Sequence, residues 1–71
     1  MITHEIIKTL GEIGGAKRLC LVSWNGNPAK LDLRIWRTDG GTLVPGRGIT
    51  LTENEAGTLA ALLEAYLTDK E

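Results

Sequence analysis

Residues 31–37, LDLRIWR, show the most regular alternation of apolar and polar side chains in the chain. Successive side chains of a β-strand point to opposite faces of its sheet, so this alternation predicts a strand over about residues 29–37. One face of this strand carries Leu31, Leu33 and Ile35, and we expect it to lie on the core. The other face carries Asp32, Arg34 and Trp36, and we expect it to be exposed to solvent.

Three further strands are predicted from similar patterns. Residues 18–24, RLCLVSW, alternate in the same way, and residues 48–52, GITLT, place two aliphatic residues on one face. Residues 4–13, HEIIKTLGEI, are predicted to form the first strand, although their apolar spacing also suits a short helix. Gly11 and the glycines that follow weaken that helix, because glycine is a poor helix former.

Turn signals separate the predicted strands. They are Gly14-Gly15, Asn25-Gly26 and Asp39-Gly40-Gly41. Asn-Gly is typical of two-residue hairpin turns, but Asn27-Pro28 directly after it predicts a slightly longer loop. Pro45-Gly46 is expected to keep the segment before the fourth strand irregular.

After Thr52 the apolar residues recur with the period of a helix. Thr52 and Glu55 fit a capping box, and early acidic residues suit the positive end of a helix dipole. Seven apolar residues then cover an arc of about 160° at 100° per residue, whereas a stripe of about 100° seats a helix on one sheet. They are Ala56, Leu59, Ala60, Leu62, Leu63, Tyr66 and Leu67. The excess width is explained equally well by contact with a second surface and by a helix that wraps its own sheet.

These elements predict one α+β domain over residues 1–71: a four-stranded antiparallel sheet followed by one C-terminal amphipathic helix. Such a sheet has one face under the helix and one wet face. A chain of 71 residues builds only a modest core, so oligomerisation is the expected additional source of stability. Cys20 and His4 are the only residues of their kinds. An intrachain disulfide is thus excluded, and neither a metal site nor a cofactor is expected.

The charges are distributed unevenly along the chain. The net charge of −1 argues against a nucleic-acid binder. Residues 17–47, however, hold six lysine or arginine residues and two aspartates, whereas residues 48–71 hold one lysine and five acidic residues. A basic middle beside an acidic end can mark an anion-binding face.

Cations and tryptophans gather on the second and third predicted strands. Single-stranded nucleic acid is bound by cations that follow the phosphates and by aromatic rings on which bases stack. The candidate nucleic-acid-binding residues are Lys17, Arg18, Trp24, Lys30, Arg34, Trp36, Arg37 and Arg47. Simpler explanations remain for three of them: Trp24 as a cap of the core, Arg34 in a surface pair with Asp32, and Arg47 as a solvated loop residue.

Other function classes fit less well. The sequence lacks a nucleophile elbow and a phosphate-binding P-loop, and its single histidine and cysteine fall on different strands, so no enzyme activity or small-molecule substrate is expected. It shows neither a signal peptide nor an apolar run near 20 residues. We therefore expect a cytoplasmic protein without a membrane partner.

The order DLRIW, PGRGITL and capped helix resembles the transcriptional coactivator family called positive cofactor 4. The stretch VSWNG-x-P-AK makes the chain most similar to the small stand-alone bacterial members, over about residues 5–67. The resemblance implies a curved four-stranded antiparallel sheet with a C-terminal helix, a homodimer formed through the helices, and single-stranded DNA across the sheets. In the family pattern Arg34 touches DNA, Trp36 occupies the aromatic position after it, and Arg47 is the basic residue of the P-G-R segment.

The dimer interface expected from the resemblance and the apolar arc is Leu59, Leu62, Leu63 and Tyr66. Two departures bear on function. Val44 stands where nuclear members have lysines, and a lysine between Arg47 and Gly48 is missing. Weaker DNA binding than in nuclear relatives is therefore expected, without a claim to coactivator activity.

The sequence thus predicts a homodimeric single-stranded DNA-binding protein with little sequence preference. It would act in transcription, replication or repair, in association with the nucleoid. RNA is left open as a second ligand. The alternative function is a dimeric protein-interaction module that does not bind nucleic acid.

Overall fold

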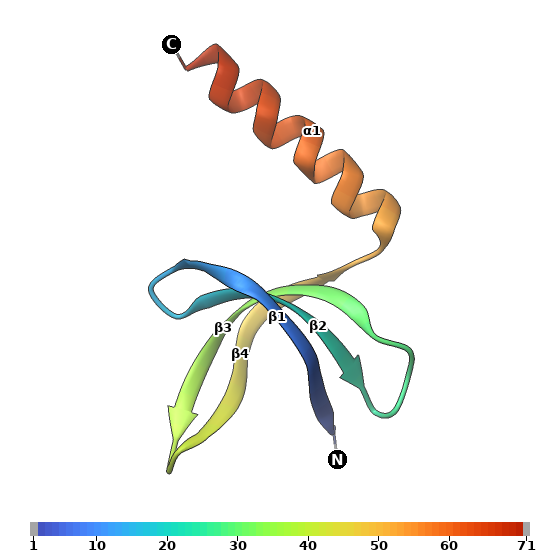
Figure 1. The fold of residues 1–71 in the computed structure, drawn as a ribbon, viewed down its shortest axis with the longest axis vertical. Helices are drawn as coiled ribbons and strands as arrows, with labels where there is room; N and C mark the ends of the chain where they lie inside the picture. Colours follow the sequence, from blue (N-terminus) through green and yellow to red (C-terminus); the bar gives the residue numbers. More distant parts are fainter. Residues whose placement is uncertain (1, 71) are drawn as a thin grey trace.

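The computed structural model describes residues 2–70 and consists of four β-strands followed by one α-helix (Figure 1). The elements are β1 (His4–Gly14), β2 (Lys17–Trp24), β3 (Lys30–Asp39), β4 (Thr42–Leu51) and α1 (Glu53–Asp69). Neighbouring strands pair antiparallel in the order β1-β2-β3-β4. The predicted α+β class and β-β-β-β-α order are confirmed, and residues 4–13 lie in a strand rather than a helix.

The β2–β3 connection follows the predicted turn chemistry. Asn25 and Gly26 have φ angles of 53° and 75°, and the Asn27 amide donates a hydrogen bond of 2.9 Å to the Trp24 carbonyl. Positive φ at both central residues is the geometry of a type I′ turn, which asparagine and glycine adopt most readily. Because β3 begins only at Lys30, the loop is longer than the turn, as predicted.

Strand β4 begins earlier than expected and includes Pro45-Gly46, and the irregularity predicted for this segment is present as a break in the β3–β4 register. Arg34 pairs with Gly48 and Trp36 pairs with Pro45, so the extra residue of β4 is absorbed in a bulge. Proline is tolerated here because β4 is an edge strand. A Cβ at Gly48 would lie 2.5 Å from the Leu33 carbonyl oxygen and overlap the Arg34 side chain. Glycine at this position therefore lets the two strands cross closely.

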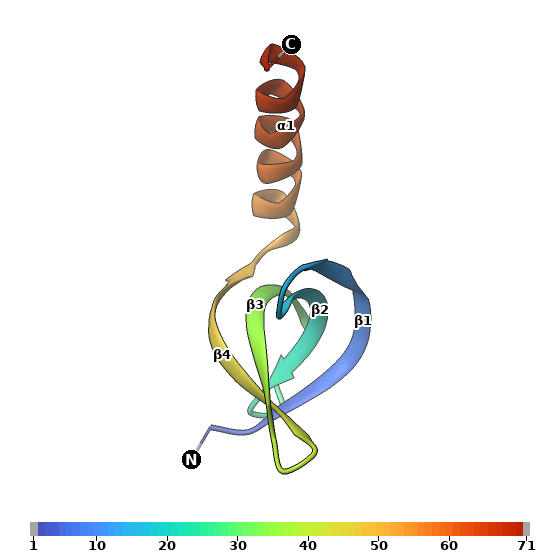
Figure 2. The same cartoon turned by 90° about the vertical axis from the view of Figure 1, so that its left-hand side faces the viewer.

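The sheet is strongly curved, and its concave face holds the core (Figure 2). Cys20 and Val22 are fully buried and Trp36 is 3% exposed. The residues that pack around them are Ile6, Trp24 and Leu43. Three register shifts in β1 contribute to the curvature, because bulges bend and twist a strand. A sheet with no second layer buries one face only by curling around it.

The two faces of β3 were grouped correctly, but their burial was predicted the wrong way round. Asp32 and Trp36 are buried on the concave face, whereas Ile35 on the convex face is 38% exposed. Leu31 and Leu33 on the convex face are only half-buried. The reason is that α1 does not cover the convex face, while the curled sheet closes over the concave one.

Helix α1 begins with the predicted capping box. The Thr52 hydroxyl accepts a hydrogen bond of 3.1 Å from the Glu55 amide, and the Glu55 carboxylate accepts one of 2.8 Å from the Thr52 amide. Beyond its first turn the helix projects away from the sheet and has no buried residue (Figure 1). The expectation of a sheet face under the helix was therefore wrong, and a helix that wraps its own sheet no longer explains the wide apolar arc. Within residues 2–70, no helix is long and apolar enough to cross a membrane.

Candidate nucleic-acid interface

Five of the eight candidate residues share the concave face of the sheet. Arg18 lies opposite Arg34, and Lys30 lies opposite the buried Val22, because directly paired residues of antiparallel strands point to the same side. The five are Arg18, Trp24, Lys30, Arg34 and Trp36. The structure does not bring the other three to this face.

Lys17 pairs with Ile35 and Arg37 pairs with Val44, so both cations belong to the convex face. Arg47 is exposed at the bulge of β4. None of these three candidates therefore lines the concave face.

Asp32 and Arg34 form an ion pair in the middle of the concave face. The Arg34 Nε and Nη2 donate hydrogen bonds of 2.7 and 2.8 Å to the two carboxylate oxygens of Asp32, and its Nη1 donates one of 2.9 Å to the Gly46 carbonyl. The Thr50 hydroxyl donates a further hydrogen bond of 3.3 Å to Asp32. The Asp32 side chain is 0% exposed and that of Arg34 is 15% exposed.

This pair is therefore not the weak surface pair considered from the sequence. A two-point guanidinium–carboxylate contact fixes the plane of the arginine as well as its position. Because Asp32 partners the Arg34 charge, the pair also lessens the repulsion expected between Arg34 and the directly opposed Arg18.

The ring of Trp24 lies near a cation and near another aromatic ring. The Arg34 Cζ lies 4.8 Å from the centroid of the Trp24 ring, a cation–π distance. The imidazole of His4 lies 5.9 Å from Trp24 and 5.5 Å from Trp36, tilted relative to both rings. Trp24 is half-buried, so it both packs on the core and reaches the surface.

Trp36 is an interior residue, so its predicted exposure was wrong. At 3% exposure it offers no ring face for a base to stack on. The indole N–H groups of Trp36 and Trp24 are both buried, and neither has a hydrogen-bond acceptor among residues 2–70. The concave surface therefore presents the ring of Trp24, with Trp36 beneath it.

Two adjoining hollows flank Trp24. One has a volume of about 410 Å³ and is lined by Trp24, Asn27, Pro28, Lys30 and Thr50. The other has a volume of about 330 Å³ and is lined by Ile2, Trp24, Asn25, Arg34 and Thr50. Both are open to solvent, and the second is the shallower of the two.

The sequence predicted Lys30 and Arg34 as site residues but not the uncharged polar residues of these hollows. Asn27 was noted only as a loop signal. Thr50 lies on β4, and its place beside Asp32 depends on the β3–β4 register. The part of the chain that the structure describes holds no cluster of three or more histidine, cysteine, aspartate or glutamate residues that could bind a metal ion. The chemistry of the concave face is therefore that of cations, hydrogen-bond groups and one accessible indole.

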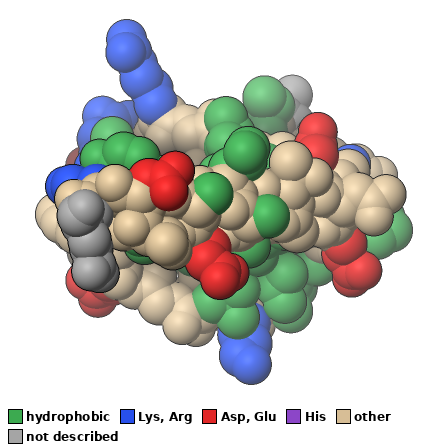
Figure 3. All heavy atoms as spheres, turned by 90° about the horizontal axis from the view of Figure 1, so that it is seen from above, with side chains coloured by type: hydrophobic (Ala, Val, Ile, Leu, Met, Phe, Trp, Pro, Cys, Tyr) green, Lys and Arg blue, Asp and Glu red, His purple; other side chains and the backbone are tan. Residues whose placement is uncertain are grey.

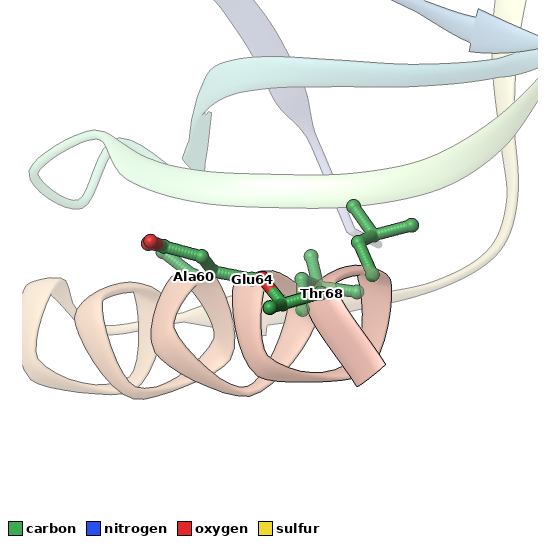
Figure 4. Close-up of a pocket in the computed structure, with 5 residues that line it drawn as sticks. Ala60, Glu64 and Thr68 are labelled. Atoms are coloured by element: carbon green, nitrogen blue, oxygen red, sulfur yellow. The ribbon is translucent and has the colours of Figure 1, made fainter. Parts of the chain in front are cut away.

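A second unusual surface lies on α1. Leu62, Leu63 and Tyr66 are 63%, 50% and 59% exposed, and Leu59 is half-buried. Viewed from above, hydrophobic side chains lie along the helix among carboxylates (Figure 3). A shallow hollow follows one side of the helix past Ala60, Glu64 and Thr68 (Figure 4). A large apolar area on one chain is typical of a surface that another protein covers.

Comparison with known proteins gives one similar protein and one matching family model. An uncharacterized protein of Treponema pallidum (strain Nichols) is 39% identical over 71 aligned residues, which cover 93% of this chain and 81% of that protein. Residues 11–62 match the family model of Transcriptional Coactivator p15 (PC4), a non-enzymatic domain that binds single-stranded DNA. This match includes β2, β3, β4 and the first half of α1. The chain therefore belongs to the PC4 family, and its family supports a nucleic-acid-binding function.

Proposed function

We propose that the protein binds single-stranded DNA along the concave face of its sheet. The observation that carries this proposal is the half-buried ring of Trp24, which Arg34 holds on one side and two open hollows flank. A fixed aromatic ring beside cations is the arrangement that single strands require, because bases stack on the ring while cations follow the phosphates.

The cations of this site have different roles. Arg18 contacts phosphates and Arg47 lies at the edge of the site, whereas Lys30 lines the hollow beside Trp24. Lys17 and Arg37 lie on the convex face, so they do not contact a strand on the concave one. Arg34 is already bound to Asp32, so it acts through its fixed plane and its remaining N–H groups rather than as a free charge. Trp36 supports the site from below. This assignment differs from the one predicted from the sequence, in which Arg34 and Trp36 of β3 both contact DNA directly.

The first test compares a single strand with the matching duplex in a binding titration at several salt concentrations. The single strand is expected to bind more tightly, because only its bases are free to stack. Its affinity should fall with a log–log salt slope of about −0.7 for each phosphate neutralised. Equal affinity for the duplex, or an affinity independent of salt, would contradict the proposal. Absence of binding would favour the alternative function, a dimeric protein-interaction module. A titration with an RNA strand of the same sequence tests whether RNA is a second ligand.

We further propose that the protein is a homodimer in which α1 and the convex sheet face are covered by a second copy. Both surfaces are apolar and uncovered within one chain: Ile35 and Ile49 of the sheet are 38% and 53% exposed, and Leu67 of the helix is 62% exposed. A symmetric pair buries matching patches of this kind together. The proposed interface residues remain Leu59, Leu62, Leu63 and Tyr66.

Leu63→Glu is expected to separate the dimer or unfold it, because it places a charge in the centre of the proposed interface. Sedimentation at micromolar concentration measures the change. Ala61→Glu adds the same charge on the opposite side of α1 and should leave the dimer intact. A folded, monomeric native protein at that concentration would refute the proposed dimer.

The proposed dimer would bind DNA in the cytoplasm, in association with the nucleoid. It would serve transcription, replication or repair through single strands that these processes expose. The missing family lysines near Val44 and Arg47 favour a weaker interaction than in nuclear members.

A further inference from the structure

The hollow between Trp24 and Pro28 has more polar character than stacking alone requires. We propose that it holds one unstacked base of the bound strand and prefers a keto base, that is thymine, uracil or guanine. This inference rests on the proposed binding of single-stranded DNA, and it replaces an absence of sequence preference with a defined one.

The β2–β3 loop forms one wall of the hollow, and hydrogen bonds within this segment hold the wall in place. The Asn27 amide donates to the Trp24 carbonyl over 2.9 Å, and the Ser23 hydroxyl donates to the Asn27 carbonyl over 2.6 Å. Both backbone groups of Asn27 are therefore used. Its side-chain amide makes no hydrogen bond within residues 2–70, so it is free to bind a ligand placed in the hollow.

The polar groups around the hollow differ in whether they donate or accept hydrogen bonds. Lys30 is exposed and contributes an ammonium group, which is a donor only. The Thr50 hydroxyl gives its proton to Asp32, which leaves it as an acceptor. Asn27 offers one donor group and one acceptor. The only charged group that lines the hollow is thus the donor of Lys30, and no carboxylate lines it.

This inventory discriminates between the two classes of base when Lys30 faces the position at which they differ. Guanine and thymine present a carbonyl oxygen where adenine and cytosine present an amino group. The Lys30 ammonium group can donate a charge-assisted hydrogen bond to the carbonyl, whereas it meets the amino group donor against donor. The acceptors of Asn27 and Thr50 can receive the ring N–H next to that carbonyl. Trp24 supplies the stacking surface for either class.

The test compares binding of oligodeoxyuridine and oligodeoxycytidine of equal length at slightly alkaline pH. The two bases differ in the carbonyl or amino group and in the neighbouring ring nitrogen, while length and phosphate charge are the same. The native protein is expected to bind the uridine strand about tenfold more tightly, the effect of one favourable hydrogen bond to a charged donor. In Lys30→Met the ratio of the two dissociation constants should fall to near one.

Lys17→Met is the matched control, because Lys17 lies on the convex face. It should keep the preference of the native protein even if it weakens binding to both strands. Equal affinity of the native protein for both strands would overturn the base preference alone, and so would a preference that survives in Lys30→Met. Failure to bind either strand would instead overturn the proposed function.

Discussion

Trp36→Ala is expected to lower the free energy of unfolding by about 3–5 kcal/mol, the usual cost of removing a large buried aromatic side chain. Trp36 is 3% exposed and forms the core with Cys20 and Val22. It also supports His4, whose ring lies 5.5 Å away. In a small domain such a loss approaches the total stability. Urea unfolding of the native and variant proteins at equal concentration measures the difference.

Comparison of Trp24→Ala with Trp36→Ala separates a role in stability from a role in DNA binding. Trp24 is half-buried, so its removal should cost less stability than that of Trp36. Its loss should weaken binding of a single strand by roughly 1–3 kcal/mol, with little change in the salt slope. If Trp36→Ala remained fully stable and lost affinity for DNA, the exposed position predicted from the sequence would be right and the buried one wrong.

Arg34→Ala is expected to lower the free energy of unfolding by about 3–5 kcal/mol, because it leaves the fully buried Asp32 carboxylate without its partner. It also removes the hydrogen bond to the Gly46 carbonyl at the β4 bulge. Arg34→Lys should recover only part of the loss, since lysine keeps the charge but lacks the planar fork. Thermal or urea unfolding measures both variants.

A double-mutant cycle assigns this loss to the pair. Asp32→Ala/Arg34→Ala should be more stable than the sum of the two single changes predicts, because the double variant leaves no charge unpartnered. Additive single changes would show that the two residues act independently. An Arg34→Ala protein of native stability, with a salt slope reduced by about 0.7, would instead identify Arg34 as a free phosphate contact.

The sequence by itself determined the elements and their order. Alternation placed β2 and β3 close to their observed bounds, and glycines favoured a strand over a helix for β1. Asn25-Gly26 predicted the β2–β3 turn, and Thr52 with Glu55 predicted the helix start. These features depend on neighbours a few residues apart, so local chemistry suffices to specify them. The same alternation correctly grouped Asp32, Arg34 and Trp36 on one face of β3.

Only the tertiary structure decided which face lies inside. A period of two divides residues between two faces, but it carries no information on the curvature of the sheet or on what covers it. The β1 bulges, the close crossing at Gly48 and the departure of α1 from the sheet turn the Trp36 face inward. Register then places Thr50 beside Asp32, which adds a polar group from the neighbouring strand, 18 residues further along the chain. The site thus depends on long-range pairing and curvature, which the spacing of residues along one strand does not encode.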